Sequence, residues 1–112
     1  MSPLRFDVVT IFPQMFRALL EEGVVSKGAE KGLIEIVVWD LREFTTDRHR
    51  STDDEAYGGG AGMVMLAEPV LRCLDAIRAV PGRESERPWV IEMSPQGRVF
   101  DHADARRITD RD

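Results

Sequence analysis

The chain has 112 residues, of which 43% are hydrophobic and 31% are charged, so it is long enough for one modest domain and too short for two. This composition is typical of a globular protein and excludes an intrinsically disordered chain. The net charge of −5 argues against indiscriminate nucleic-acid binding, because sequence-independent affinity comes mainly from Lys and Arg side chains that neutralise phosphates.

The apolar residues do not form a membrane segment. No apolar run approaches the roughly 20 residues that cross a bilayer, and Asp7 interrupts the short apolar stretch near the N-terminus, so we expect no signal peptide. The single cysteine, Cys73, fits a reducing compartment. We therefore expect a cytoplasmic protein without membrane contact.

The first third of the chain predicts two strands separated by helices. Residues 5–11 are rich in β-branched side chains and are followed by Pro13, which predicts a strand and then the first turn of a helix. Apolar residues at helical spacing continue until Gly23, which we expect to end that helix, and a second helical piece covers 24–30. Residues 33–39 are almost continuously apolar, as in a parallel-sheet strand covered on both faces.

The rest of the chain begins with a stretch that has no apolar periodicity. Charges, threonines and glycines over residues 40–62 predict a long loop, and loops of this length are usually functional or disordered. Helical spacing resumes over 70–80, and residues 89–93 predict a third strand that runs directly into Ser94-Pro95-Gln96-Gly97. Residues 102–111 predict a mostly polar helix.

Strands that alternate with helices predict an α/β fold with a mostly parallel sheet and right-handed crossovers. Ligands of such sheets bind beyond the carboxyl ends of the strands. We expect three segments there: residues 11–13 after the first strand, the long loop after the second, and residues 94–97 after the third. Their convergence predicts a binding site at this edge.

The long loop carries the densest group of candidate binding side chains. Arg48, His49 and Arg50 offer donors for phosphates or base edges. Asp53 and Asp54 only accept hydrogen bonds when ionised, which suits the donor edge of a base or a Mg²⁺ ion.

An aromatic residue and four glycines follow in the same loop. Tyr57 is suited to stack on a base. Glycines allow the backbone to approach a ligand closely, and four occur here: Gly58, Gly59, Gly60 and Gly62. Taken singly, each feature of the loop is better explained by a solvated, flexible segment.

Three familiar sites do not fit the loop. A Walker A motif requires Lys after its last glycine, and the residue after Gly62 is not lysine. The glycines do not lie at a strand-to-helix turn with the spacing of a dinucleotide-binding fold. A metal site built from Asp47, His49, Asp53 and Asp54 has no recognised ligand spacing, so we assign no metal ligand.

Residues 43–65 taken together point to one protein family far more specifically than any single feature of the loop does. Residues 43–65 (EFTTDRHRSTDDEAYGGGAGMVM) closely resemble the signature of the bacterial tRNA (guanine-N1)-methyltransferases. Residues 6–13 (FDVVTIFP), with Met15 and Phe16 after them, resemble the opening of that family, and residues 91–100 (IEMSPQGRVF) resemble its SPQGR segment. Three motifs in the right order make coincidence an inadequate explanation.

The resemblance implies a SPOUT-type, trefoil-knot methyltransferase domain that works as a homodimer and uses S-adenosylmethionine. It implies methylation of N1 of the guanosine immediately 3′ of the anticodon, with the tRNA anticodon stem-loop as partner; Mg²⁺ is a candidate second cofactor. Residues 1–112 would be the N-terminal portion of the methyltransferase domain, without the knot-forming segment and the C-terminal helical domain. We therefore expect this fragment to be inactive and assign it no catalytic residue.

The matched motifs also imply where the ligands bind. The tRNA would be contacted from the long loop, by Arg48, His49, Arg50, Asp53, Asp54, Tyr57, Gly58, Gly59, Gly60 and Gly62, with Asp53 the best candidate for a contact to guanine. The S-adenosylmethionine pocket would be lined by Glu92, Met93, Ser94, Pro95, Gln96 and Gly97. Glu92 departs from the family, which often has an aromatic residue there; its carboxylate either attracts the sulfonium ligand or is a local idiosyncrasy.

Two hypotheses of other classes compete with the enzyme. One is a stand-alone α/β module that binds tRNA or a nucleotide without catalysis. The other is an interaction domain whose exposed half-core pairs with another chain. The reading frame downstream of Asp112 discriminates between an enzyme and a module.

Overall fold

The computed structural model describes residues 3–45, 53–55, 63–65, 67–83 and 87–110. Its centre is a pair of parallel strands, β1 (Leu4–Thr10) and β2 (Ile34–Asp40). Leu4 lies opposite Ile34 and Thr10 opposite Asp40, so both strands end at the same edge. The predicted α/β fold with a parallel sheet is confirmed, as are the positions of the first two strands.

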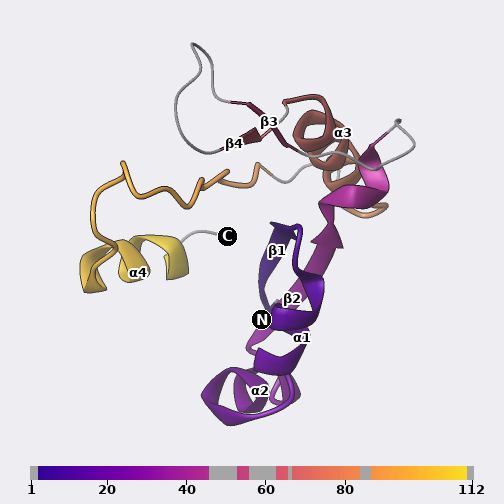
Figure 1. Cartoon of the computed structure of the whole chain (residues 1–112). Helices are drawn as coiled ribbons and strands as arrows, with labels where there is room; N and C mark the ends of the chain where they lie inside the picture. The colour runs from indigo at the N-terminus through magenta and orange to yellow at the C-terminus, as the bar shows by residue number, and fades with distance from the viewer. Residues whose placement is uncertain (1–2, 46–52, 56–62, 66, 84–86, 111–112) are drawn as a thin grey trace.

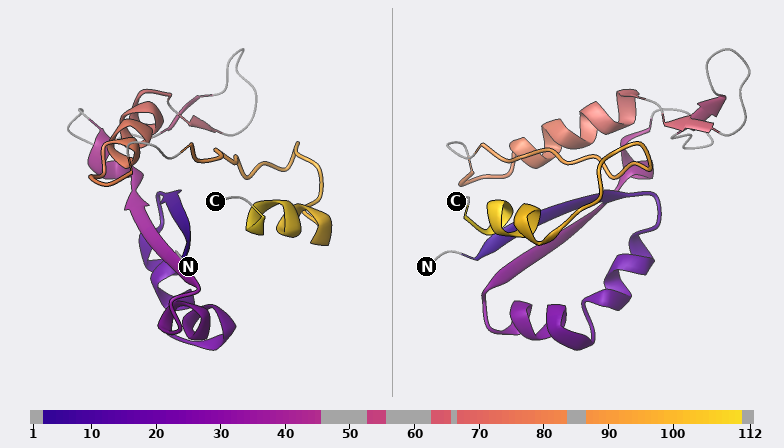
Figure 2. Two further views of the ribbon diagram at one scale, coloured as in Figure 1. Left: turned by 180° about the vertical axis from the view of Figure 1, so that it is seen from behind. Right: turned by 90° about the vertical axis from the view of Figure 1, so that its left-hand side faces the viewer.

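Two helices connect these strands and lie on one side of the sheet (Figures 1 and 2). Pro13 begins α1 (Pro13–Leu19), as predicted, and α2 spans Gly23–Glu30. The prediction that Gly23 ends the first helix was wrong, because Gly23 is the first residue of α2. Its φ of +88° is a conformation that glycine adopts without steric cost, and it lets the chain change direction between the two helices.

A small core forms where the carboxyl end of the sheet meets α3 (Ala67–Arg78). Its buried apolar residues are Leu41, Cys73 and Ile77. Leu41 belongs to the short 3-10 helix η1 (Leu41–Phe44), which packs against α3. Burial raises the pKa of the Cys73 thiol to about 11, so this cysteine is a protonated packing residue at neutral pH, as its place on an amphipathic helix predicts.

The structure differs from the predicted long loop in two places. The side chain of Asp40 accepts a hydrogen bond from the Arg42 backbone N–H at 2.9 Å and so begins η1. Further on, β3 (Asp53–Glu55) and β4 (Met63–Met65) pair as an antiparallel hairpin. Strands of three residues are too short to produce a periodic pattern, which is why the sequence predicts only loop there.

The predicted third strand is absent from the described structure. Residues 87–100 run as an irregular segment beside the sheet (orange in Figure 1), and its apolar members are exposed: Trp89 49%, Ile91 55% and Met93 85%. The prediction was wrong because strand propensity reports only that a segment fits a sheet. Ladder hydrogen bonds also need a neighbouring edge, and no described strand pairs with this segment.

The segment leads into α4 (His102–Thr109), which confirms the predicted polar helix. Asp101 and Asp104 form a reciprocal capping box at its start.

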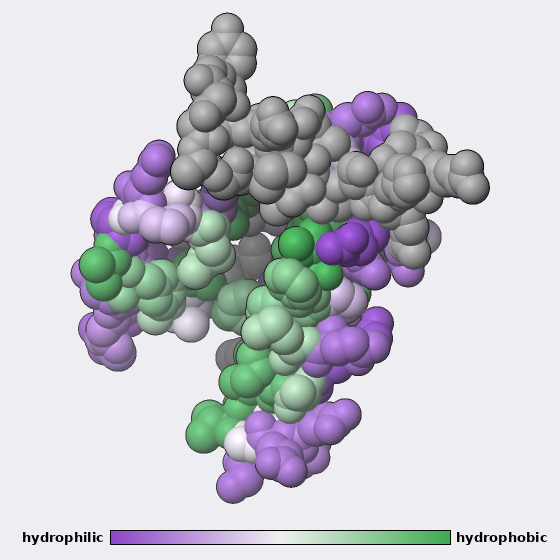
Figure 3. Space-filling model, viewed as in Figure 1, coloured by the Kyte–Doolittle hydropathy of each residue, from purple (hydrophilic) through white to green (hydrophobic). Residues whose placement is uncertain are grey.

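In Figure 3, apolar side chains reach the surface along the column formed by the sheet, α1 and α2. At α1 and just before it, the exposed large apolar residues are Phe12, Met15 and Leu19, with exposures of 57%, 67% and 61%. Among the described helices, none is long and apolar enough to cross a membrane.

The core makes one prediction about stability. Leu41 is fully buried, so Leu41→Ala should lower the free energy of unfolding by about 3 kcal/mol through lost transfer energy and a cavity. Leu71, on α3, is 59% exposed and provides the matched control; Leu71→Ala should change stability by less than about 0.5 kcal/mol. Urea unfolding monitored by circular dichroism measures both, and equal losses would show that η1 does not contribute to the core.

Candidate functional site

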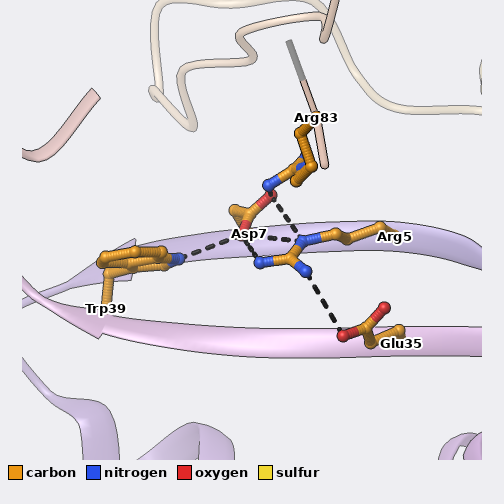
Figure 4. Close-up of polar contacts among 5 residues, drawn as sticks. All are labelled: Arg5, Asp7, Glu35, Trp39 and Arg83. Atoms are coloured by element: carbon orange, nitrogen blue, oxygen red, sulfur yellow. Dashed lines mark hydrogen bonds and ion pairs between the residues drawn. The ribbon is translucent and has the colours of Figure 1, made fainter. Parts of the chain in front are cut away.

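A polar cluster lies on the sheet, centred on the Asp7 carboxylate (Figure 4). The Trp39 indole N–H of β2 donates to Asp7 Oδ1 at 3.0 Å, and Arg5 Nη2 donates to the same oxygen at 3.1 Å. Arg83 Nη1, from the turn after α3, lies 3.1 Å from Asp7 Oδ2. Arg5 also reaches Glu35 Oε1 at 3.3 Å. The cluster therefore connects both strands to the segment that follows α3.

The electrostatics of Asp7 follow from these partners. Burial on its own raises the pKa of the Asp7 carboxyl, but hydrogen bonds from Arg5 and Trp39 and the charges of Arg5 and Arg83 outweigh it, and the pKa is lowered from its ordinary value. Only 11% of the side chain is exposed. A lowered pKa means that the ionised carboxylate stabilises the folded state. The sequence shows Asp7 only as an interruption of an apolar stretch, since its partners come from distant segments.

Asp7 allows a prediction of pH dependence. Asp7→Asn should lower the free energy of unfolding at pH 7 by about 2 kcal/mol, the usual size for hydrogen bonds to a charged group. Because the folded pKa is lowered, this contribution is present above the unfolded pKa and is lost as pH falls through the folded one. The difference between wild type and variant should therefore shrink below about pH 4.

Urea titrations at several pH values measure this difference. Asp75→Asn, at an exposed position of α3, is the control and should show no comparable pH-dependent difference. A difference between wild type and the Asp7→Asn variant that stays constant down to about pH 2 would contradict a stabilising carboxylate.

Two of the three segments that were predicted at the carboxyl edge of the sheet leave the sheet there. After β1, the Phe12 backbone N–H donates to Thr10 Oγ1 at 2.9 Å, which turns the chain into α1. After β2, the chain leaves the same edge through η1 toward the long loop. The third expected member, residues 94–97, follows an irregular segment instead of a third strand, and its place at this edge stays a prediction.

The predicted tRNA-binding residues lie mostly outside the described residues: Arg48, His49, Arg50, Tyr57, Gly58, Gly59, Gly60 and Gly62. Asp53 and Asp54 are described by their backbone alone. They belong to β3, where Asp53 pairs with Met65 and Asp54 with Val64. A hairpin, and not a continuous loop, therefore carries the two carboxylates.

The predicted cofactor segment is described in full and ends in a tight turn. Gly97 N–H donates to the Ser94 carbonyl oxygen at 3.1 Å, and Gln96 N–H donates to Ser94 Oγ at 3.2 Å. A Cβ at Gly97 would lie 3.3 Å from the Ser94 carbonyl oxygen, so a side chain there would force the turn to open slightly. Residues 92–97 are all exposed. The turn is therefore accessible from solvent.

Arg98 and Asp104 attach this turn to α4, and neither is among the site residues predicted from the sequence. Arg98 Nη1 donates to Asp104 Oδ2 at 3.0 Å, and Arg98 Nη2 pairs with Asp104 Oδ1. Asp104 is 6% exposed. The sequence carries two signals for this pair: the arginine that ends SPQGR, and the spacing of Asp101 and Asp104, which is typical of a capping box.

The structure describes the two parts of the predicted site unequally, with residues 92–97 in full and the β3–β4 hairpin by its backbone. Among the described backbone groups, no hydrogen bond links residues 92–97 with β3 or β4. Across the described ranges, no three His, Cys, Asp or Glu side chains gather into a potential metal site.

Comparisons with known proteins agree on one family. The family model described as tRNA (Guanine-1)-methyltransferase TrmD matches residues 4–112. The chain is 46% identical over 109 residues to a tRNA (guanine-N(1)-)-methyltransferase of Koribacter versatilis, covering 97% of this chain and 41% of the relative. It is 45% identical over 105 residues to the Geobacter metallireducens protein of the same name, covering 94% of this chain and 41% of that one.

A solved structure is also similar. The crystal structure of tRNA (m1G37) methyltransferase from Aquifex aeolicus matches with a TM-score of 0.84 and 32% sequence identity, covering 98% of this chain and 48% of that one. The chain therefore spans less than half the length of the relatives that it matches.

Proposed function

We propose, since the chain belongs to the tRNA (guanine-1)-methyltransferase family, that it contributes to methyl transfer from S-adenosylmethionine to N1 of the guanosine immediately 3′ of the tRNA anticodon. The observation that carries this proposal is the family match over residues 4–112, which includes all three motifs. The matched relatives are named for this guanine-N1 transfer.

The chemistry explains what such a protein must supply. Guanine N1 carries a proton at neutral pH, so transfer needs a base to remove it and hydrogen-bond donors to stabilise charge on O6. Displacement at a sulfonium methyl requires alignment of the nucleophile, the carbon and the leaving sulfur. We assign no base within these 112 residues, and we propose that residues 1–112 form the N-terminal portion of the methyltransferase domain, with a helical domain following.

We propose that residues 92–97 contact S-adenosylmethionine, which supplies the methyl group when bound. The tight Ser94–Gly97 turn fits this role because its exposed backbone offers donors and acceptors, while the absence of a Cβ at Gly97 keeps the turn narrow. Glu92 is exposed beside the turn, and its carboxylate would attract a sulfonium cation.

For the tRNA, we propose contacts from the segment between η1 and α3. Anticodon-loop bases are unpaired and are read on their Watson–Crick edges, and a carboxylate accepts from the N1 and N2 donors of guanine. Asp53 is the proposed guanine contact, with Arg48 and Arg50 toward phosphates. We also propose that Asp53 and Asp54 bind Mg²⁺, and that the full-length protein is a homodimer located in the cytoplasm.

The activity test compares full-length protein with residues 1–112. Labelled S-adenosylmethionine should transfer its methyl group to tRNA with full-length protein, and transfer should disappear when adenosine replaces the guanosine after the anticodon. The isolated 1–112 fragment should show no transfer. Full-length protein that binds tRNA but transfers no methyl group would contradict the enzyme and favour a binding module.

A variant tests the proposed guanine contact. In full-length protein, Asp53→Ala should reduce kcat/KM for tRNA at least about tenfold, because loss of a hydrogen bond to a charged group costs about 1.5 kcal/mol or more. The dissociation constant of S-adenosylmethionine, measured by calorimetry, should stay within about twofold, as it should for the control Asp75→Ala. Equal losses in tRNA methylation and cofactor binding would place Asp53 in the other pocket.

A further inference from the structure

We infer that Arg98 is a positioning residue, which holds the Ser94–Gly97 turn in its ligand-binding shape through a two-point ion pair with Asp104 of α4. The inference rests on the proposed function, because it concerns the turn assigned there to S-adenosylmethionine. The arginine adjoins that turn directly, since it follows Gly97 in the chain.

The geometry of the pair restricts both distance and orientation. One guanidinium nitrogen donates to Asp104 Oδ2 at 3.0 Å and the other pairs with Oδ1. A planar guanidinium that meets both carboxylate oxygens cannot rotate without losing one contact. The Asp104 side chain is 8% exposed and that of Arg98 is 70% exposed, so the arginine lies over a carboxylate that is itself held in place.

Asp104 is fixed independently of Arg98. Its backbone N–H donates to Asp101 Oδ1 at 2.9 Å, and its Oδ2 accepts from the Asp101 backbone N–H at 3.1 Å, which completes the capping box. Arg107, one turn further along α4, pairs with Asp104 Oδ1 as well. Loss of Arg98 therefore leaves the carboxylate paired and the helix capped, while the turn loses its attachment.

The turn has little else to hold it. Within residues 91–97, the hydrogen bonds that the structure describes are the two inside the turn, from Gly97 and Gln96 to Ser94. Every residue of this stretch is exposed, so packing restrains it little. The Arg98–Asp104 pair is thus the described contact that joins the turn to regular structure.

The experiment uses full-length protein and S-adenosylmethionine as the probe. Arg98→Met keeps the aliphatic stem and removes both ion-pair contacts. It should raise the dissociation constant and the KM of S-adenosylmethionine about tenfold, while kcat and the KM of tRNA stay within about twofold. Arg98→Lys, which restores the charge without the two-point geometry, should recover only part of the affinity. Arg106→Met, at an exposed position of α4, is the matched control and should leave all four values unchanged.

Thermal unfolding separates positioning from stability. The melting temperature of Arg98→Met should match that of Arg106→Met, because the capping box and Arg107 remain to stabilise α4. Unchanged affinity in Arg98→Met, full recovery by lysine, a loss confined to kcat, or a fall in melting temperature that accounts for the weaker binding would each overturn the inference. Wild-type protein that does not bind S-adenosylmethionine would instead refute the proposed function of the turn.

Discussion

The carboxylate of Asp7 joins three parts of the chain that are far apart in sequence. It lies on β1, accepts from Trp39 on β2, and pairs with Arg83 in the turn after α3. A sheet of two described strands with three buried apolar core residues has little packing to align these parts. Burying one carboxylate is unfavourable, but two guanidinium groups and an indole N–H compensate for its lost hydration. The ionised Asp7 carboxylate therefore stabilises the arrangement of these three parts.

A second arginine–carboxylate pair lies at the far end of the segment that carries the SPQGR motif. Arg83 is paired with Asp7 before the segment, and Arg98 is paired with Asp104 at its end. Residues 87–97 between them are exposed and lie outside the described ladders. Arginine–carboxylate pairs, and not strand hydrogen bonds, thus locate both ends of the proposed binding segment. Both carboxylates are mostly buried, so salt screens these pairs less than it would screen exposed ones.

Periodicity predicted most of the regular structure, because the apolar spacing that predicts β1, β2, α1 and α3 is a local property of the sequence. It failed where structure depends on a distant partner. Residues 89–93 have the composition of a strand without a described neighbour to pair with, and Asp53–Glu55 form a strand too short for a pattern. For the site, the three motifs predicted the candidate residues. The structure forms a tight turn at Ser94–Gly97, within the third motif. The pairing of Asp7 with Arg83 could not be predicted, and the sequence signals at Arg98 and Asp104 do not reveal that these two side chains meet.

A turn held from outside has a thermodynamic consequence for ligand binding. Ordering one backbone residue costs about 1–2 kcal/mol, so a free four-residue turn would lose much of its interaction energy when it binds. A turn already closed by Ser94 and attached through Arg98 has met part of that cost before the ligand arrives. Affinity for the proposed ligand would then depend on groups that never contact it. The capping box of α4 would contribute to the proposed cofactor site, because it immobilises the carboxylate to which the turn is attached.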